Sequence, residues 1–324
     1  MTGYIIRRVL QAIPLLLLIS VVVFALANAM PSGLMAAYEN NPNITKEDLV
    51  RLQEELGLNT PPHIKYLNWL GATLRGDLGY SLTERRPVTD ILAERIPNTI
   101  YLTIISFIVS LVIAIPIGIL SARRQYSAFD HLATGFAFIG QSIPIFWFGL
   151  ILIIVFNVLL KNPATGRPLL PGGGMYTIGA PFSVADRLQH LILPVAMLSV
   201  FQVAQHMRYM RSSMLDVIHQ DYIRTARAKG LREQAIVYGH ALKNALLPVV
   251  TVIGLELPTL VSGAFFTETI FSWPGMGRLF VNAAGLGDYT VLMAIVMLSA
   301  LLVIVFNLLT DITYAFLDPR IQYS

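Results

Sequence analysis

The chain has 324 residues, of which 55% are hydrophobic and 13% are charged. Soluble domains carry about 25% charged residues, so this chain has too few polar groups to cover a folded surface in water. Its formal net charge of +4 comes from basic residues spread along the chain, which argues against a nucleic-acid partner. It has no cysteine, which excludes disulfides and thiol catalysis.

Apolar residues come in uninterrupted blocks that are long enough to cross a membrane. A helix that crosses about 30 Å of hydrocarbon needs about 20 residues. Six blocks reach this length: Val9–Ala29, Ile100–Ser121, the stretch between Asp130 and Lys161, Leu188–Met207, Ala245–Thr267, and the stretch between Asp288 and Asp311. The sequence therefore predicts an all-α integral membrane protein with six transmembrane helices.

The first block has an alternative interpretation as a cleaved signal peptide. Arg7 and Arg8 precede it, and it ends in Ala27-Asn28-Ala29, which resembles a cleavage site. We favour a retained span, because the apolar run exceeds the usual length of a signal peptide's apolar region. Its removal would also leave five spans, with the two ends of the chain on opposite sides.

The segment after the first span, residues 30–98, is too long for a simple connector. Thr45, with an acidic residue three positions later, resembles a capping box and predicts an amphipathic helix. Gly76–Ser81 predicts a turn. Val88–Arg95 predicts a second short helix, which ends before Pro97. We expect this loop to be partly helical.

The fourth and fifth predicted spans contain polar residues, which favours a protein interior or an aqueous path over lipid. Glu256 is the only acidic residue well inside a predicted span. A charge at that depth indicates either a functional group or a paired structural one. Thr259 and Gly263 lie on nearly the same helical face. We predict that Glu256, Thr259 and Gly263 line a translocation path.

Basic residues predict the orientation of the spans. Arg7 and Arg8 place the N-terminus in the cytoplasm. Seven basic residues follow the fourth span, on what is then the cytoplasmic side: Arg208, Arg211, Arg224, Arg227, Lys229, Arg232 and Lys243. With six spans, the C-terminus is cytoplasmic as well.

Within this basic segment, Asp221 is expected to cap a helix of about two turns. Ala226 and Ala228 favour helix, and Gly230 suits the left-handed position that ends one. A second helical pattern, Leu231–Leu247, continues into the fifth span. The loop is therefore predicted to be an ordered helical hairpin. On the residues alone, a basic loop that binds anionic lipid is the alternative.

Several motifs resemble the permease subunits of peptide-type ABC importers, in particular the first of the two permeases in dipeptide and oligopeptide systems. The resemblance covers nearly the whole chain, and five stretches carry it: Asp221–Leu231, His240–Pro248, Gly76–Gly79, Ile143–Trp147 and Phe271–Arg278. It implies a type I ABC importer permease architecture for the six helices.

The resemblance also implies that the segment after Asp221 is a coupling helix, which sits in a groove on an ATPase subunit. The residues that match this motif are Tyr222, Arg224, Thr225, Ala226, Arg227, Ala228, Lys229 and Gly230. Small side chains permit close approach, whereas Tyr222 provides an aromatic anchor and the arginines can pair with acidic groups. The wider superfamily has Glu-Ala-Ala where this chain has Arg224-Thr225-Ala226.

The implied partners are a second homologous permease, two ATP-binding cassette ATPase subunits, an extracytoplasmic binding protein and the lipid membrane of a prokaryotic cell. The chain contains no Walker-type phosphate loop, and we expect no enzymatic activity, metal or cofactor. The predicted divisions are a transmembrane helix at 1–29, an extracytoplasmic loop region at 30–98, a core permease domain at 99–318 that includes a cytoplasmic coupling loop at 208–248, and a tail at 319–324.

The resemblance leaves the substrate open, because similar permeases carry short peptides, nickel chelates, glutathione or oligosaccharides. Two other classes of protein compete with an importer subunit. A self-sufficient secondary transporter is expected to contain internal repeats, and an intramembrane enzyme needs a nucleophile with a base or a metal cluster. Neither signature stands out in the sequence.

Overall fold

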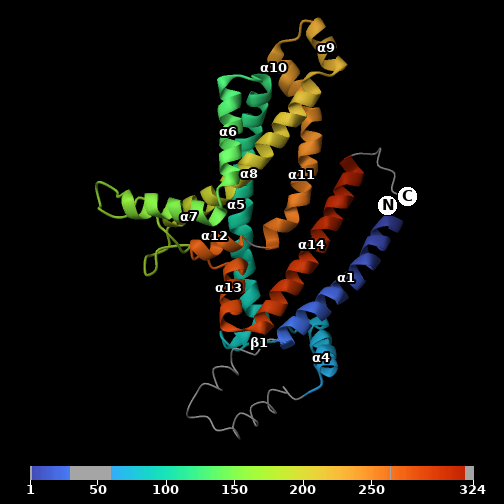
Figure 1. The fold of residues 1–324 in the computed structure, drawn as a ribbon, viewed down its shortest axis with the longest axis vertical. Helices are drawn as coiled ribbons and strands as arrows, with labels where there is room; N and C mark the ends of the chain where they lie inside the picture. Colours follow the sequence, from blue (N-terminus) through green and yellow to red (C-terminus); the bar gives the residue numbers. More distant parts are fainter. Residues whose placement is uncertain (1, 30–59, 263, 318–324) are drawn as a thin grey trace.

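The computed structural model describes residues 2–29, 60–262 and 264–317. Nearly all regular structure in these residues is helical, which confirms the all-α prediction (Figure 1). The elements are α1 Thr2–Ala29, α4 Pro62–Leu74, β1 Tyr80–Ser81, β2 Arg86–Pro87, α5 Val88–Arg123, α6 Ala128–Ser142, α7 Ile145–Ile153, the π-helical η1 Ile154–Leu159, α8 Val184–Ile218, α9 Asp221–Ala228, α10 Glu233–Ala235, the π-helical η2 Ile236–Ala241, α11 Leu242–Ser262, α12 Phe265–Ile270, α13 Met276–Leu286 and α14 Tyr289–Leu317.

Two long helices, α5 and α8, form the centre of the molecule and contact each other along their length. Small residues bring them close together. A Cβ atom at Gly118 would lie 2.7 Å from the Met210 Cβ, so glycine is needed at this contact. The α6 and α11 helices flank the pair, while α14 and α1 form an outer layer (Figure 1). The α9 helix lies at one end of the molecule, and β1 lies at the other.

Five helices of the described chain are long and apolar enough to cross a membrane, and the count is six if a bent pair of helices forms one span. This pair, α6 with α7 and η1, corrects the third predicted span, because its halves meet at an angle of 99° instead of forming one straight helix. The break falls at Ile143-Pro144, where Ile143 has extended backbone angles. Proline disfavours helical geometry in the residue before it and has no N–H to donate.

The second and fifth predicted spans also have different ends in the structure. The short helix predicted to stop before Pro97 is wrong, because α5 runs from Val88 through this proline to Arg123. The Asn98 side chain donates to the Glu94 carbonyl at 3.1 Å, next to the backbone bond that Pro97 cannot make. The fifth span was predicted to reach Thr267, yet α11 ends at Ser262 and Phe265–Ile270 forms the separate helix α12.

Part of the long loop after α1 folds back onto α1. The hydroxyl groups of Ser20 and Tyr66 lie 2.8 Å apart, and the Phe24 ring packs at 5.4 Å from Tyr66 and 5.7 Å from Trp69. The predicted turn is confirmed, since Gly76 and Gly79 both have positive φ angles. The helix predicted from Thr45 lies outside the described residues.

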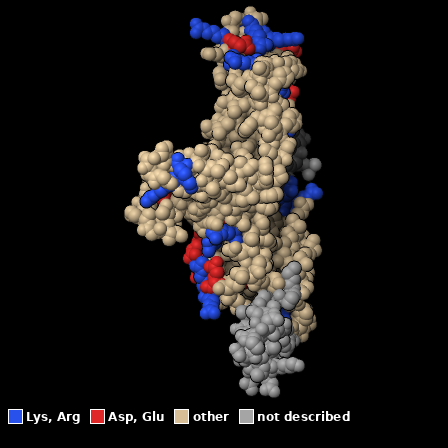
Figure 2. Space-filling model, turned by 60° about the vertical axis from the view of Figure 1, so that its left-hand side comes forward, with Lys and Arg blue, Asp and Glu red and all other residues tan. Residues whose placement is uncertain are grey.

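Figure 2 shows an uncharged band across the body of the molecule, with charged side chains gathered at the α9 end, on the projecting arm around η1, and near the opposite end. The apolar band is consistent with lipid as the solvent for the helices. The first residues of α1 and the last residues of α14 lie toward the same end of these two helices, which pack side by side (Figure 1).

Candidate functional site

The α9 helix packs on its own chain through one face. Ile223 and Ala226 are buried, in a cluster that includes Met214, Ile236 and Val237. The other seven residues of the predicted coupling motif are all exposed: Tyr222, Arg224, Thr225, Arg227, Ala228, Lys229 and Gly230. The helix is two turns long, as predicted. The expected cap was wrong, because Asp221 is the first helical residue and Gln220 is the N-cap, without a side-chain capping bond.

The end of α9 is fixed by a turn and an ion pair. Gly230 has φ of +75°, which confirms the left-handed position. Arg227 Nη2 lies 2.8 Å from Glu233 Oε1, and this hydrogen bond raises the pKa of Arg227. Arg224 and Asp221 form a looser pair at 3.4 Å, with 78% and 95% of their side chains exposed. Arg224 of α9 and Lys229 at its C-cap are both exposed, so they can reach a partner.

The predicted hairpin is confirmed with a different local geometry. The second helical segment begins at Glu233 and passes through the π-helical η2 before α11. Asn244 Nδ2 donates to the Tyr222 hydroxyl at 2.9 Å, which links α9 to the start of α11. The cluster around Ile223 also includes buried residues of α5 and α8. A force applied to α9 therefore acts on tightly packed residues from several spanning helices.

Glu256 contacts two polar side chains of α8. It accepts a hydrogen bond from Gln205 Nε2 at 2.8 Å, and its other oxygen lies 2.7 Å from His206 Nε2. The opposite nitrogen of His206 lies 3.3 Å from the Ser110 hydroxyl of α5. The His206 side chain is 1% exposed and the Glu256 side chain is 22% exposed, so Glu256 is the accessible end of a polar link across three helices.

The serine, histidine and glutamate in this link are residue types that also occur in hydrolases. Here the Ser110 hydroxyl donates to the Phe107 carbonyl at 2.7 Å, so its proton is directed away from His206. The arrangement is therefore a hydrogen-bonded brace and does not present an activated nucleophile. Of the two residues predicted to share the Glu256 face, the Thr259 side chain and the whole of Gly263 lie outside the described residues.

Sequence reasoning missed a buried charge pair near the α9 end. Asp130, at the start of α6, is 2% exposed, and Arg211 of α8 donates two hydrogen bonds to it at 2.7 Å. Ser121 of α5 also donates to Asp130. This fork geometry ties three helices together. The sequence contained both charges, but no local pattern indicated that they meet.

A second missed carboxylate, Glu268, organises the stretch from Phe271 to Arg278. It is 0% exposed and accepts hydrogen bonds from Thr99 Oγ1 at 2.6 Å, Gly277 N at 2.6 Å and Arg278 N at 3.1 Å. Its carboxylate thus satisfies free N–H groups at the start of α13. A Cβ atom at Gly275 would lie 2.4 Å from this carboxyl group, which explains the glycine in the motif.

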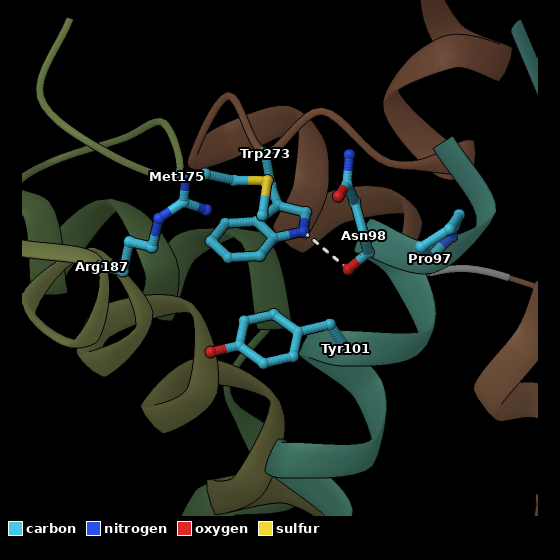
Figure 3. Close-up of a pocket in the computed structure, with 6 residues that line it drawn as sticks. All are labelled: Pro97, Asn98, Tyr101, Met175, Arg187 and Trp273. Atoms are coloured by element: carbon cyan, nitrogen blue, oxygen red, sulfur yellow. Dashed lines mark hydrogen bonds between the residues drawn. The ribbon is translucent and has the colours of Figure 1, made fainter. Parts of the chain in front are cut away.

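The same stretch forms one wall of a pocket of about 370 Å³, which is lined by Pro97, Asn98, Tyr101, Met175, Arg187 and Trp273. Figure 3 shows the rings of Tyr101 and Trp273 facing each other, with the Arg187 guanidinium beside Met175 at their edge. Trp273 is 1% exposed, and its ring N–H donates to the Asn98 carbonyl at 2.9 Å. The pocket therefore has a fixed indole wall.

Two family models match the chain. The N-terminal family of binding-protein-dependent transport system membrane components matches residues 1–103. The family described as binding-protein-dependent transport system inner membrane component matches residues 114–323. The chain belongs to this family. It is therefore a multi-pass membrane protein of the permease type, as its motifs predicted.

Among individual relatives, the chain is 46% identical to the oligopeptide transport system permease protein AppB of Bacillus subtilis (strain 168), over the full length of both chains. It is 39% identical to the dipeptide transport system permease protein DppB of Escherichia coli (strain K12), again over both full chains. A chain of the MetNI methionine ABC transporter, solved in inward-facing conformations, is similar in structure with a TM-score of 0.54 and 19% identity. That match covers 70% of this chain and 96% of the other, and it shows a shared fold.

Proposed function

We propose that the chain is the membrane permease subunit of an ATP-driven importer of short peptides. Full-length similarity to an oligopeptide permease and a dipeptide permease supports this substrate class. In the proposed importer the chain forms half of the translocation path, beside a second homologous permease. Two ATP-binding cassette ATPases act in the cytoplasm and a binding protein delivers the peptide on the other side. ATP hydrolysis then belongs to separate chains.

We assign the docking of an ATPase to α9 and its exposed residues. The cations Arg224 and Lys229 suit an acidic groove, and the Arg227–Glu233 pair holds the helix end in a fixed shape. Rigid packing of Ile223 and Ala226 allows movement of an ATPase to reach the spanning helices. These features support the coupling role that the motif predicts for this segment.

Replacing a single glycine tests the coupling assignment. Gly230→Asp puts a side chain and a charge at a φ of +75°, where any L-residue is strained. We expect the variant to reach the membrane and to import less labelled peptide. Fewer ATPase subunits should co-purify with it than with the wild type. Gly166→Asp is the matched control, because Gly166 has a similar φ of +65° and open space around it but lies at a distance along the chain from α9. Normal ATPase recovery and uptake with Gly230→Asp would contradict the assignment.

The proposed orientation places both termini and α9 in the cytoplasm. The side-by-side packing of α1 and α14 supports it, since their outer ends point the same way. Alkaline phosphatase is active only after export, so a fusion after Ser324 is expected to be inactive and an insertion at Gly166 active. An active fusion after Ser324 would contradict the proposed cytoplasmic location of the C-terminus.

Within the spans, we infer that Glu256 faces the path taken by the peptide. Its exposed fraction of 22%, compared with 1% for His206, supports access from an internal space. A carboxylate there favours a cationic group such as the amino terminus of a peptide. His206 and Gln205 hold the carboxylate in place.

A further inference from the structure

The pocket between α5, α8 and the stretch from Phe271 to Arg278 contains Arg187, whose guanidinium forms no ion pair within 4.0 Å among the described residues. The Arg187 guanidinium carbon lies 5.1 Å from the centre of the Tyr176 ring and 5.0 Å from that of Phe182. Aromatic faces attract a guanidinium but do not use its N–H donors. Arg187 is therefore held in position with its hydrogen-bonding edge uncommitted.

The adjacent acidic residue, Asp186, attracts Arg187 electrostatically but directs its hydrogen bonds to other groups. Asp186 accepts hydrogen bonds from the Thr177 backbone N–H at 2.8 Å and from the Thr177 hydroxyl at 2.6 Å. Its Oδ1 also lies 3.6 Å from His190 Nδ1. These contacts direct the Asp186 carboxylate toward Thr177 and His190. An incoming carboxylate at Arg187 therefore has little competition from within the chain.

The rest of the pocket is rigid and, apart from Asn98, mainly aromatic or apolar. The Tyr101 and Trp273 rings are stacked, with centres 6.4 Å apart and planes inclined by 16°. Asn98 fixes the loop by donating to the Pro274 carbonyl at 2.8 Å. A volume of about 370 Å³ suits one end of a small molecule. Such a pocket, with a cation at the edge of aromatic walls, fits a carboxylate carried on an apolar body.

We propose that this pocket binds the carboxylate end of a peptide in transit, with Arg187 pairing the carboxylate and the adjoining side chain packed against the exposed Tyr101 ring, which Trp273 supports from behind. The inference rests on the proposed function as a peptide permease and adds a subsite to it. The guanidinium fork matches two carboxylate oxygens. The same chemistry occurs at a chain terminus and in an acidic side chain, so the experiment includes both sources.

Photocrosslinking tests this subsite in membrane vesicles that contain the complete importer. The probe is a tripeptide with benzoylphenylalanine at its last position, because the excited benzophenone inserts readily into methionine side chains and Met175 lines the pocket. Three forms are compared: the free acid, the C-terminal amide, and an amide with glutamate at the second position. We expect labelling at Met175 to be about tenfold higher for the free acid than for the plain amide, as for loss of a charge-assisted pair. Labelling by the glutamate form at the level of the free acid would identify an acidic side chain as an equal source.

Variants assign the effect to Arg187. Arg187→Gln should remove the preference for the free acid, and Arg187→Lys should retain part of it, because lysine keeps the charge without the fork. Arg167→Gln, on the exposed preceding loop, should leave it unchanged. Equal labelling of the wild type by free acid and plain amide would overturn the proposal, as would a full preference in Arg187→Gln. If Arg187→Gln fails to reach the membrane, the comparison of peptides in the wild type and Arg187→Lys still decides.

Uptake of an unmodified labelled tripeptide by cells that produce the same importer separates this inference from the proposed function. Absence of peptide uptake by the wild type would reject the function itself. Normal uptake without labelling at Met175 would reject the subsite alone.

Discussion

Glu256 and Glu268 are successive acidic residues in the sequence, but their surroundings in the fold differ. Glu268 is fully buried, and two of its partners are backbone N–H groups that cannot rotate away. Glu256 is partly exposed, and its partners include the side chains of Gln205 and His206. Fixed donors hold a carboxylate permanently, whereas side-chain donors can change partner when a ligand arrives.

The kind of donor around each carboxylate indicates its role better than its depth in the membrane does. Fixed backbone donors indicate a structural role, whereas side-chain donors are compatible with a role in transport. Both residues are acids in an apolar chain, so hydropathy treats them alike. Glu268 stabilises the start of α13 and holds the Trp273 loop against α5. The Glu256 side chain is 22% exposed. The comparison predicts that changes at Glu268 reduce stability and that changes at Glu256 reduce transport with little loss of stability.

The largest expected effect is that of Glu268→Leu. It leaves the Gly277 and Arg278 N–H groups without their acceptor inside the protein, and each unsatisfied buried group costs about 1–3 kcal/mol. We expect the free energy of unfolding of the purified protein to fall by about 2–6 kcal/mol. Glu94→Gln is the control, since Glu94 forms an exposed pair with Arg86 and such pairs contribute about 0–1 kcal/mol. A Glu268 variant as stable as this control would contradict the structural role.

A smaller loss is expected when the space around Glu268 is filled. Gly275→Ala places a Cβ within 2.4 Å of the Glu268 carboxyl group, and overpacking of this kind costs about 1–3 kcal/mol. Gly285→Ala, in the same helical segment, meets nothing within 4 Å and should stabilise α13 by about 0.5–1 kcal/mol. Thermal melts of the two variants should therefore shift in opposite directions. Shifts in the same direction would show that the Glu268 site tolerates the methyl group.

The sequence predicted features that depend on neighbouring residues. The α9 helix and the turn at Gly230 follow from a short run of helix-forming residues and one glycine. The apolar blocks likewise located the spans, because membrane crossing imposes a length on each block. The break at Pro144 had a local cause as well, but hydropathy averages over the bend and cannot give its angle.

Contacts between distant residues could not be predicted in the same way. Glu268 meets Thr99, and Asp130 meets Arg211, only after the helices have packed. A single sequence contains no signal for such pairs. The glycines of the stretch from Phe271 to Arg278 were visible, but their reason, the carboxylate of Glu268 beneath them, became clear only from the fold. Glu256 was found because it is an acid inside an apolar block.

The smallest change in structure, Glu256→Gln, tests the transport side of the comparison. Gln205 can still donate to the new side chain's oxygen. The amide nitrogen then faces His206, and a neutral imidazole can present either ring nitrogen as an acceptor. Because the link to α8 can be retained, we expect stability to change by no more than about 1 kcal/mol.

Uptake should respond differently, because the substitution removes the charge that attracts a peptide's amino group. We expect uptake of a peptide with a free amino terminus to fall about tenfold, which corresponds to about 1.4 kcal/mol. Uptake of the N-acetylated form of the same peptide should be nearly the same in wild type and variant, since acetylation removes the cation. Basal ATPase activity and recovery of the assembled importer serve as controls for folding. An equal fall for both peptides would assign Glu256 to the helix brace, and unchanged uptake would show that its charge plays no part in passage.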